Sequence, residues 1–394
     1  MPGKTRILSF IVIAQFFCTS LWFAGNAVMN NLISAYGLND SALGQLTSAV
    51  QLGFISGTLV FALLTIADRF SPSKVFFVCS ILGAVFNIAI IFDQNTYTSI
   101  LVFRFLTGFT LAGIYPVGMK IAADHFQKGL GKSLGFLVGA LVLGTAFPHL
   151  VKAFTTGLPW KTVMIFTSIL DLAGGLLIRL FVPDGPHRKQ ASKFDFTALF
   201  SVFKYPNFRQ AAFGYFGHMW ELYTFWAFVP VILMSFVELN PQEIINIPVW
   251  SFIIIGLGSL ACIIGGYISL NVGVKLTATS ALFLSLCCCL LSPFIILSGS
   301  KFLLLGYMIF WGLVVIADSP LFSTLVAQNA PEESKGTALT IVNSIGFAIT
   351  IFSILFINYL RTVLPVQYVF IFLSIGPALG IINLIYKRQP SPVA

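Results

Sequence analysis

The chain has 394 residues, of which 57% are hydrophobic and only 9% are charged. Because a soluble globular protein averages about 25% charged residues, this composition excludes that class and indicates a protein with many membrane-spanning segments. The net charge of +9 does not indicate a nucleic-acid partner, because the basic residues are spread over short segments between apolar runs.

Twelve apolar segments are long enough to cross a lipid bilayer, which takes about 20 residues of helix. We expect helices because an open sheet would leave backbone groups without hydrogen bonds in lipid. The first segment follows Lys4 and Arg6, as a signal peptide would, but it continues for about 25 residues without a small-residue cleavage site, so we expect a retained span. The predicted spans are 7–33, 43–66, 75–92, 99–121, 133–154, 161–182, 209–236, 247–269, 275–297, 302–326, 336–358 and 367–386.

The lysines and arginines are unevenly divided between the two sides that this order of spans defines. With a cytoplasmic N-terminus, 17 of the 22 lie inside and four lie outside, while Arg104 lies within a span. The positive-inside rule therefore predicts that both termini are cytoplasmic. We expect a multi-pass protein of a bacterial-type inner membrane.

The longest polar stretch is PDGPHRKQASKFDFTALFSVFKYPNFRQ, residues 183–210, and it divides the spans into six and six. Its basic, proline-containing composition is typical of a linker, and 194–203 is a candidate amphipathic piece on the inner leaflet. The predicted domains are an N-terminal six-helix bundle, 1–182, a cytoplasmic linker, 183–208, and a C-terminal six-helix bundle, 209–394.

The two halves of the chain repeat some features about 200 residues apart. Pro116 precedes Gly131 by 15 residues, and Pro320 precedes Gly336 by 16. This pattern favours a duplicated six-helix unit, an architecture of many secondary transporters.

The six cysteines all fall within apolar segments, and three of them are consecutive at 287–289. Their spacing matches no zinc or redox motif, so we interpret them as small buried side chains. We expect no disulfide, no metal site and no cofactor.

Three motifs lie in a consistent order along the predicted spans. After the second span, IADRFSPSK (66–74) contains Asp68, Arg69 and the basic Lys74; the fourth span contains RFLTG (104–108), and the fifth contains GFLVGALVLGTAFP (135–148). With these motifs, the twelve spans and the long central loop, nearly the whole chain resembles the major facilitator superfamily. It departs from that family's loop motif at the glycine positions, where Leu64 and Ser71 stand. The resemblance implies a monomeric transporter whose first, fourth, seventh and tenth spans line a central cavity.

A histidine and a glutamate lie three residues apart in GYFGHMWELYTFWAF (214–228). Inserting a charged side chain into the middle of a membrane costs about 2.5–3.5 kcal/mol on insertion scales, so each such residue requires a structural or functional explanation. His218 and Glu221 share a helix face, and they either meet each other or jointly face the cavity. We predict proton coupling by Glu221, Asp318 and His218; the alternative is a set of hydrogen bonds that fixes neighbouring spans together.

Pro320, two residues after Asp318, is expected to kink the tenth span and to act as a gate hinge. Arg104 is a candidate ligand for a substrate carboxylate; the alternatives are a pair with Glu221, an outward-reaching side chain, or a structural or gating role. Asp171 and His149 are interpreted as packing contacts.

Aromatic and amide side chains on the spans that line the cavity suit a partly apolar organic solute. Asp68, Arg69 and Lys74 lie at the inner boundary and are predicted, with Pro320, to gate the cytoplasmic side. The other predicted substrate-binding residues, besides Arg104, are Trp22, Asn26, Tyr115, Trp220, Tyr223 and Trp311.

The leading hypothesis is a secondary transporter that moves a small organic solute by alternating access, with protons as the coupling ion. No G-x-x-x-x-G-K-[ST] loop indicates ATP use. A membrane-embedded enzyme using His218 and Glu221 is an alternative, but no H-E-x-x-H or G-x-S-x-G accompanies them. A sensor or scaffold is a third, disfavoured by the lack of a sizeable soluble domain. Direction stays open: the glycines of the fifth span favour efflux of drugs or metabolites, and Arg104 with His218 favours uptake of an organic anion.

Overall fold

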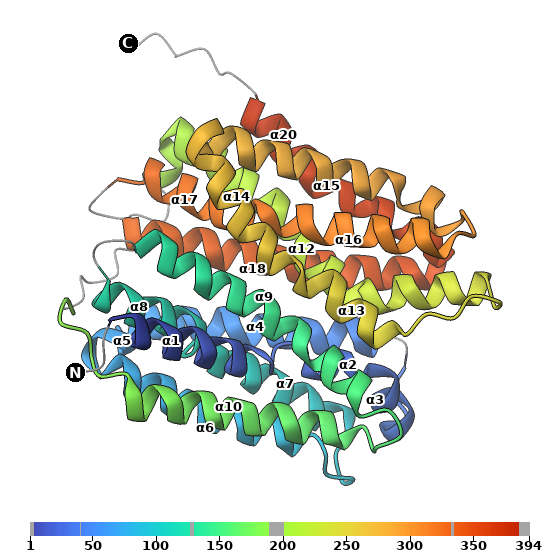
Figure 1. The fold of residues 1–394 in the computed structure, drawn as a ribbon, viewed down its shortest axis with the longest axis horizontal. Helices are drawn as coiled ribbons and strands as arrows, with labels where there is room; N and C mark the ends of the chain where they lie inside the picture. Colours follow the sequence, from blue (N-terminus) through green and yellow to red (C-terminus); the bar gives the residue numbers. More distant parts are fainter. Residues whose placement is uncertain (1–3, 40, 127–129, 189–200, 332–334, 386–394) are drawn as a thin grey trace.

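The computed structural model describes residues 4–39, 41–126, 130–188, 201–331 and 335–385. Every regular element in these residues is a helix, and the helices lie side by side along the long axis of the molecule (Figure 1). The helix α1 starts, and α20 ends, on the same side, which we call the terminal end; the other side is the opposite end.

The first half of the chain forms the lower part of Figure 1 and the second half the upper part. The first half contains α1 (Lys4–Thr19), α2 (Ala24–Ala27), α3 (Met29–Tyr36), α4 (Ala42–Leu63), α5 (Ile66–Arg69), α6 (Pro72–Ala89), α7 (Tyr97–Leu111), α8 (Tyr115–His125), α9 (Leu130–Phe154) and α10 (Lys161–Phe181). The second contains η1 (Val202–Lys204), α12 (Pro206–Leu239), α13 (Ile247–Gly256), α14 (Gly258–Val272), α15 (Val274–Ile296), α16 (Lys301–Ala317), α17 (Ser319–Asn329), α18 (Lys335–Val363), α19 (Val366–Val369), η3 (Phe370–Ser374) and α20 (Ile375–Ile385).

Within the described residues, eleven helices or runs of consecutive helices are long and apolar enough to cross a membrane. The remaining predicted span, 7–33, is a broken helix made of α1, α2 and α3. Its apolar helical part, Arg6–Thr19, is shorter than the other eleven spans. The predicted all-helical fold with twelve spans in two bundles is confirmed. The domain boundaries at 182/183 and 208/209 stay predictions, and residues 194–200 of the expected amphipathic piece lie outside the described residues.

The two halves meet mainly through three helix–helix contacts: α9 packs on α13 and on α14, and α4 packs on α18. Inside the first half, α4 and α7 approach very closely, because a Cβ at Gly53 would collide with the carbonyl oxygen of Phe105, and one at Gly108 with that of Val50. Small residues at a helix contact allow this close packing in membranes. Gly108 of the RFLTG motif is therefore a packing residue.

The fourth and tenth spans break at matched positions. The helices α8 and α17 have 11 residues each, and each has a proline as its second residue, Pro116 and Pro320. A proline in the first turn of a helix is well tolerated, but it cannot donate a backbone hydrogen bond to the preceding helix, so the span is interrupted there. This match supports the internal repeat.

Candidate functional site

A buried histidine–aspartate pair joins the seventh span to the break in the tenth. His218 Nδ1 lies 2.7 Å from Asp318 Oδ1, and each side chain is only 1% exposed. Asp318 stands between α16 and α17, where its carbonyl oxygen accepts the first hydrogen bond of α17 from the Phe322 amide at 2.8 Å. The interaction therefore links an ionisable pair to a helix break.

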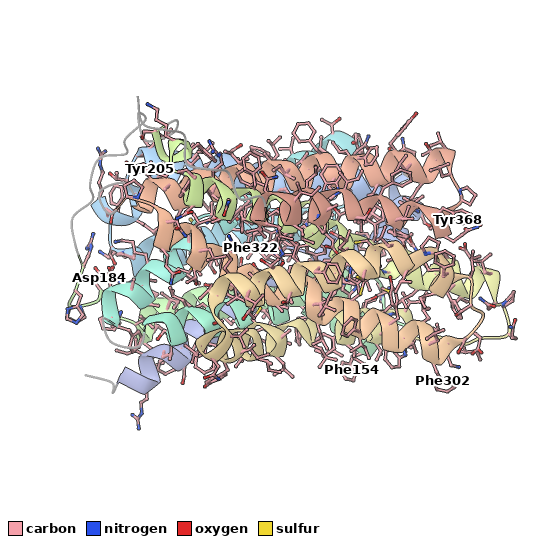
Figure 2. The ribbon with its side chains drawn as sticks, turned by 90° about the horizontal axis from the view of Figure 1, so that it is seen from above. Phe154, Asp184, Tyr205, Phe302, Phe322 and Tyr368 are labelled. Atoms are coloured by element: carbon pink, nitrogen blue, oxygen red, sulfur yellow. The ribbon has the colours of Figure 1, made fainter. Side chains whose placement is uncertain are left out.

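The pair lies well inside the protein. The ring of His218 is 6.0 Å from that of Tyr215 and 6.1 Å from that of Phe322. Figure 2 shows Phe322 between the two ends of the molecule, nearer the terminal end, which carries Asp184 and Tyr205, than the opposite end, which carries Phe302 and Tyr368. A charge at this depth has few water molecules to stabilise it.

Glu221 makes a separate set of contacts inside the second half. Its Oε1 accepts hydrogen bonds from Ser285 Oγ at 2.5 Å, Trp311 Nε1 at 2.6 Å and Cys289 Sγ at 3.2 Å. Its Oε2 is buried without a hydrogen-bond partner. His218 and Glu221 thus face different neighbours rather than each other. The Trp311 indole, which donates to the Glu221 carboxyl group, also packs on the ring of Phe225, with ring centroids 4.6 Å apart.

The first span is unwound where Arg104 reaches it. Between α1 and α2 the backbone makes short turns of the i to i−3 type, such as Trp22 N to Thr19 O at 3.1 Å. Arg104 Nη1 donates to the carbonyl of Leu21 at 3.2 Å, and Nη2 to that of Trp22 at 2.6 Å. Gly25 leaves room for the guanidinium, since a Cβ there would lie 3.3 Å from Nε. This geometry is that of a cap on a broken helix, and it favours the structural role of Arg104 over the alternative pair with Glu221.

Buried aromatic rings join the two halves. Trp22 and Phe54 of the first half pack against Tyr223 and Phe347 of the second, with ring centroids 4.6–5.9 Å apart. Trp226 continues this group, 5.2 Å from Tyr223. We call these five side chains the aromatic layer. Two of its members, Trp22 and Tyr223, are predicted substrate-binding residues.

A cavity of about 350 Å³ opens at the opposite end of the molecule. It lies between the halves, because α2, α3 and α9 line it from one side and α12, α13 and α18 from the other. Trp22 lies five residues before Ala27 of the cavity wall and Tyr223 lies four residues before Ala227, on spans that run from the terminal end toward the opposite end. The aromatic layer therefore lies at the inner side of the cavity. The lining residues are Asn26, Ala27, Met29, Asn30, Asn31, Ile33, Leu43, His149, Lys152, Ala227, Pro230, Val231, Met234, Ile247, Pro248 and Arg361.

The remaining predicted substrate residues are dispersed. Asn26 lines the cavity and donates to Thr47 Oγ1 at 2.8 Å. Trp220 faces the twelfth span, where its Nε1 donates to the carbonyl of Phe372 at 3.4 Å. Tyr115 is half-buried as the first residue of α8, at the break of the fourth span. The structure therefore places Asn26 in the cavity wall and Trp22 and Tyr223 next to it, whereas Tyr115, Trp220, Trp311 and Arg104 do not line the cavity.

The predicted gating residues lie at the terminal end. Asp68 pairs with Lys120 of α8 at 2.7 Å. Arg188 Nη2 donates to the carbonyls of Asp68 and Phe70 at 2.7 and 2.8 Å, which holds the start of the linker on the first half. Arg69 and Lys74 are exposed. These contacts lie within the first half and the adjoining linker.

Sequence reasoning missed several partners of these groups. Ser285 and Cys289, which bond Glu221, look like ordinary span residues, and Lys152 and Arg361 look like loop-proximal charges. Asp171, interpreted as a packing contact, is buried, and its carbonyl accepts a bond from Ser80 Oγ at 2.5 Å. His149, interpreted in the same way, lines the cavity. The three-residue spacing of His149 and Lys152, which places them on one helix face, is a signal from which a shared site could have been predicted.

Comparison with known proteins identifies the family. The family model described as "Major Facilitator Superfamily" matches residues 11–354. The chain is 26% identical over 193 residues to the "Putative metabolite transport protein YyaJ" of Bacillus subtilis, covering 48% of this chain and 40% of that protein. It is 26% identical over 148 residues to the "Benzoate transport protein" of Acinetobacter baylyi, covering 35% and 30%. These matches span less than half the length of either relative.

Solved structures share the fold over nearly their whole length. A bacterial homolog of the human lysosomal transporter Spinster, in an inward-facing and occupied conformation, has a TM-score of 0.75 at 12% identity, covering 98% of this chain and 96% of that one. A mutant of the nucleoside transporter NupG has a TM-score of 0.74 at 14% identity, covering 96% and 99%. The human organic anion transporter MFSD10 has 0.72 at 15%, covering 98% and 100%. At these identities the likeness concerns the fold alone.

Proposed function

The chain belongs to the Major Facilitator Superfamily, and we propose that it moves a small organic solute across a membrane by alternating access, driven by protons. As a member of this family it is a transporter and not an enzyme, so the alternative of a membrane-embedded enzyme built on His218 and Glu221 is wrong. Benzoate is the first candidate solute, because one relative is a benzoate transport protein. We expect a monomer that works as a symporter or antiporter.

Alternating access needs a passage that is open on one side and closed on the other. The cavity at the opposite end and the aromatic layer next to it support this requirement. Because the layer joins Trp22 and Phe54 of one half to Tyr223 and Phe347 of the other, it has to separate when the halves rearrange. A state open to the terminal end would form when these rings part.

The observation that carries the proton coupling is the buried pair of His218 and Asp318 at 2.7 Å. Removing the charge of one member leaves the other buried and uncompensated, which is strongly unfavourable inside a protein. Protonation of Asp318 therefore weakens the link between α12 and the break of the tenth span, and deprotonation restores it. Glu221 is the second proposed proton site, because Oε2 is left for a proton while Oε1 accepts three hydrogen bonds.

Among its described residues, the first half has no ionisable pair at the matching place. Gln15 of the first span packs against Gly118 of α8, where a Cβ would collide with its Oε1, much as His218 packs near Phe322 of α17. Ile114 precedes α8 as Asp318 precedes α17. Proton coupling is thus proposed for the second half alone.

We place the terminal end in the cytoplasm of a bacterial-type inner membrane. Lys120, Arg188, Lys204 and Arg209 lie in the segments at this end, as the positive-inside rule requires of cytoplasmic loops. Asp68, Arg69 and Lys74 would then act on the cytoplasmic side, together with the hinge at Pro320.

The proposal is tested with purified protein in liposomes and radiolabelled benzoate. Uptake is expected to accelerate when the external medium is more acidic, after subtraction of passive entry into protein-free liposomes. Asp318→Asn, His218→Gln and Glu221→Gln should each lose this acceleration but still exchange internal for external benzoate without a gradient. An unchanged gradient response in Asp318→Asn would overturn the coupling assignment, and the absence of benzoate exchange in the unaltered protein would exclude benzoate.

A further inference from the structure

We propose that the cavity at the opposite end is a binding site for organic anions, with the carboxylate held by His149, Lys152 and Arg361. This inference rests on the proposed transport function and names the substrate class: a small acid with one anionic group on a mostly apolar body.

Basic side chains reach the cavity from both halves. Lys152 belongs to α9 and Arg361 to α18, and among the described lining residues none is acidic. Lys152 Nζ donates to Asn31 Oδ1 at 3.0 Å, a neutral acceptor that leaves the charge uncompensated within that contact. The guanidinium of Arg361 lies 5.4 Å from the centroid of the Phe228 ring. Cations of like sign in a recess with low-dielectric walls concentrate anions there.

His149 supplies a deeper polar group that lacks a partner. Its side chain is 2% exposed, and its Nε2 is buried with no hydrogen-bond partner, although the residue lines the cavity. Leaving a buried polar atom without a bond costs about 1–3 kcal/mol. His149 and Lys152 are three residues apart on α9 and share a face, so one anionic group can contact both. A carboxylate oxygen would complete the bonding of the imidazole.

The rest of the wall fits the body of such a solute. Met29, Pro230, Val231 and Met234 are apolar, and the amide of Asn30 adds a polar edge. A volume of about 350 Å³ lies in the range of pockets that bind small organic ligands, roughly 300–1,000 Å³. Arginine can bind a carboxylate through two parallel hydrogen bonds, which favours Arg361 as the orienting contact.

This assignment replaces the expectation for Arg104. The Arg104 guanidinium donates to two backbone carbonyls of the first span, so its geometry serves the helix break. A solute that enters from the opposite end would instead contact the cavity residues before it reaches the aromatic layer. With the terminal end in the cytoplasm, this location favours uptake of an anion over export.

The electrostatic preference of the cavity can be measured without a known substrate. Asn30→Cys places a thiol in the wall, in a background where the half-buried Cys287 is replaced by serine. The quantity measured is the rate of reaction with the anionic reagent methanethiosulfonate ethylsulfonate divided by the rate with its trimethylammonium counterpart. At low salt, this ratio should be about tenfold higher at Asn30→Cys than at the exposed control Ser298→Cys. Lys152→Gln or Arg361→Gln should each reduce this ratio by about threefold.

Lys301→Gln is the matched charge control, because Lys301 lies at the same end but pairs with Glu243 at 2.8 Å. It should leave the ratio unchanged. Equal ratios at Asn30→Cys and Ser298→Cys, or faster reaction of the cationic reagent at Asn30→Cys, would overturn the proposal.

A second measurement tests binding. Aromatic and aliphatic monocarboxylates, each compared with its neutral amide, should slow the modification of Asn30→Cys, and His149→Phe should weaken this protection. Equal protection by the amides, or no protection by any carboxylate, would contradict an anion site. Neither assay requires transport, so a failure of proton coupling in Asp318→Asn would be recognised separately.

Discussion

Arg104 Nη2 donates a 2.6 Å hydrogen bond to the carbonyl oxygen of Trp22, so a side chain of the fourth span supplies a hydrogen-bond donor to the unwound backbone of the first span. The Trp22 side chain belongs to the aromatic layer between the halves. The position of this ring therefore depends on a side chain that is nowhere near the ring in sequence.

Replacing Arg104 by methionine should destabilise the protein. Two buried carbonyls would lose their donors, at about 1–3 kcal/mol each. Thermal unfolding in detergent should show a large decrease in Tm for Arg104→Met and a smaller one for Arg104→Lys, which keeps the charge but not the planar fork. A normal Tm for Arg104→Met with lost solute binding would instead support the direct substrate role that the sequence suggested.

Phe347→Ala should weaken the contact between the halves. Its ring lies 4.6 Å from Phe54, 5.9 Å from Trp22 and 5.2 Å from Tyr223, and only the last of these contacts lies within its own half. Contacts made in only one conformation bias the equilibrium toward it. Spin labels on Thr156→Cys and Ser298→Cys, exposed sites at the opposite end, should report a broader distribution of distances in Phe347→Ala.

The control for this experiment lies on the same helix. Phe356 packs on Trp220 and Phe372, both within the second half, at 6.0 and 6.1 Å. Phe356→Ala should leave the distance distribution unchanged. The same broadening in both variants would mean that the aromatic layer has no special part in holding the halves together.

Trp311→Phe should lower stability without changing the KM for solute. The indole donates to Glu221 Oε1 at 2.6 Å, and a hydrogen bond to a charged group contributes about 1.5–3 kcal/mol. Denaturant unfolding measures the first effect and uptake kinetics the second. A raised KM with normal stability would instead indicate that Trp311 contacts the solute, as the sequence predicts.

Asp68→Asn should change stability very little. The Asp68–Lys120 pair is 2.7 Å long, but its side chains are 27% and 23% exposed, and such pairs contribute about 0–1 kcal/mol. Arg188→Gln should cost more, because Arg188 also bonds the carbonyls of Asp68 and Phe70. Unfolding at low and high salt tests both, since salt screens the ion pairs Asp68–Lys120 and Arg188–Asp184 but leaves the hydrogen bonds from Arg188 to the two carbonyls. An Asp68→Asn loss larger than that of Arg188→Gln would be inconsistent with this ranking.

The spans could be predicted because lipid requires long apolar helices, and such helices are recognised in the sequence as runs of about 20 apolar residues. The break in the first span could not, because the segment 20–23 contains no proline, and the interruption depends on a donor from Arg104. The break in the tenth span was foreseeable, since Pro320 removes a donor at that point.

The ionisable residues were found by their cost in lipid, but their partners were not. Helical spacing places His218 and Glu221 on one face, yet the rotation of α12 directs the first toward Asp318 and the second toward Ser285 and Trp311. Rotation depends on packing against neighbouring helices, among them α17, α18 and α20, which no local pattern encodes. The cavity was missed because its basic residues come from two spans far apart in the chain.

The halves share a break at the same place in the fourth and the tenth span, but among the described residues only the second break carries a buried acid–base pair. Under the proposed coupling, uptake or loss of a proton acts directly on the second half, and the break at Tyr115 follows through the contacts between the halves. The working cycle of this protein would then be asymmetric, with a driven half and a passive one built from the same ancestral unit.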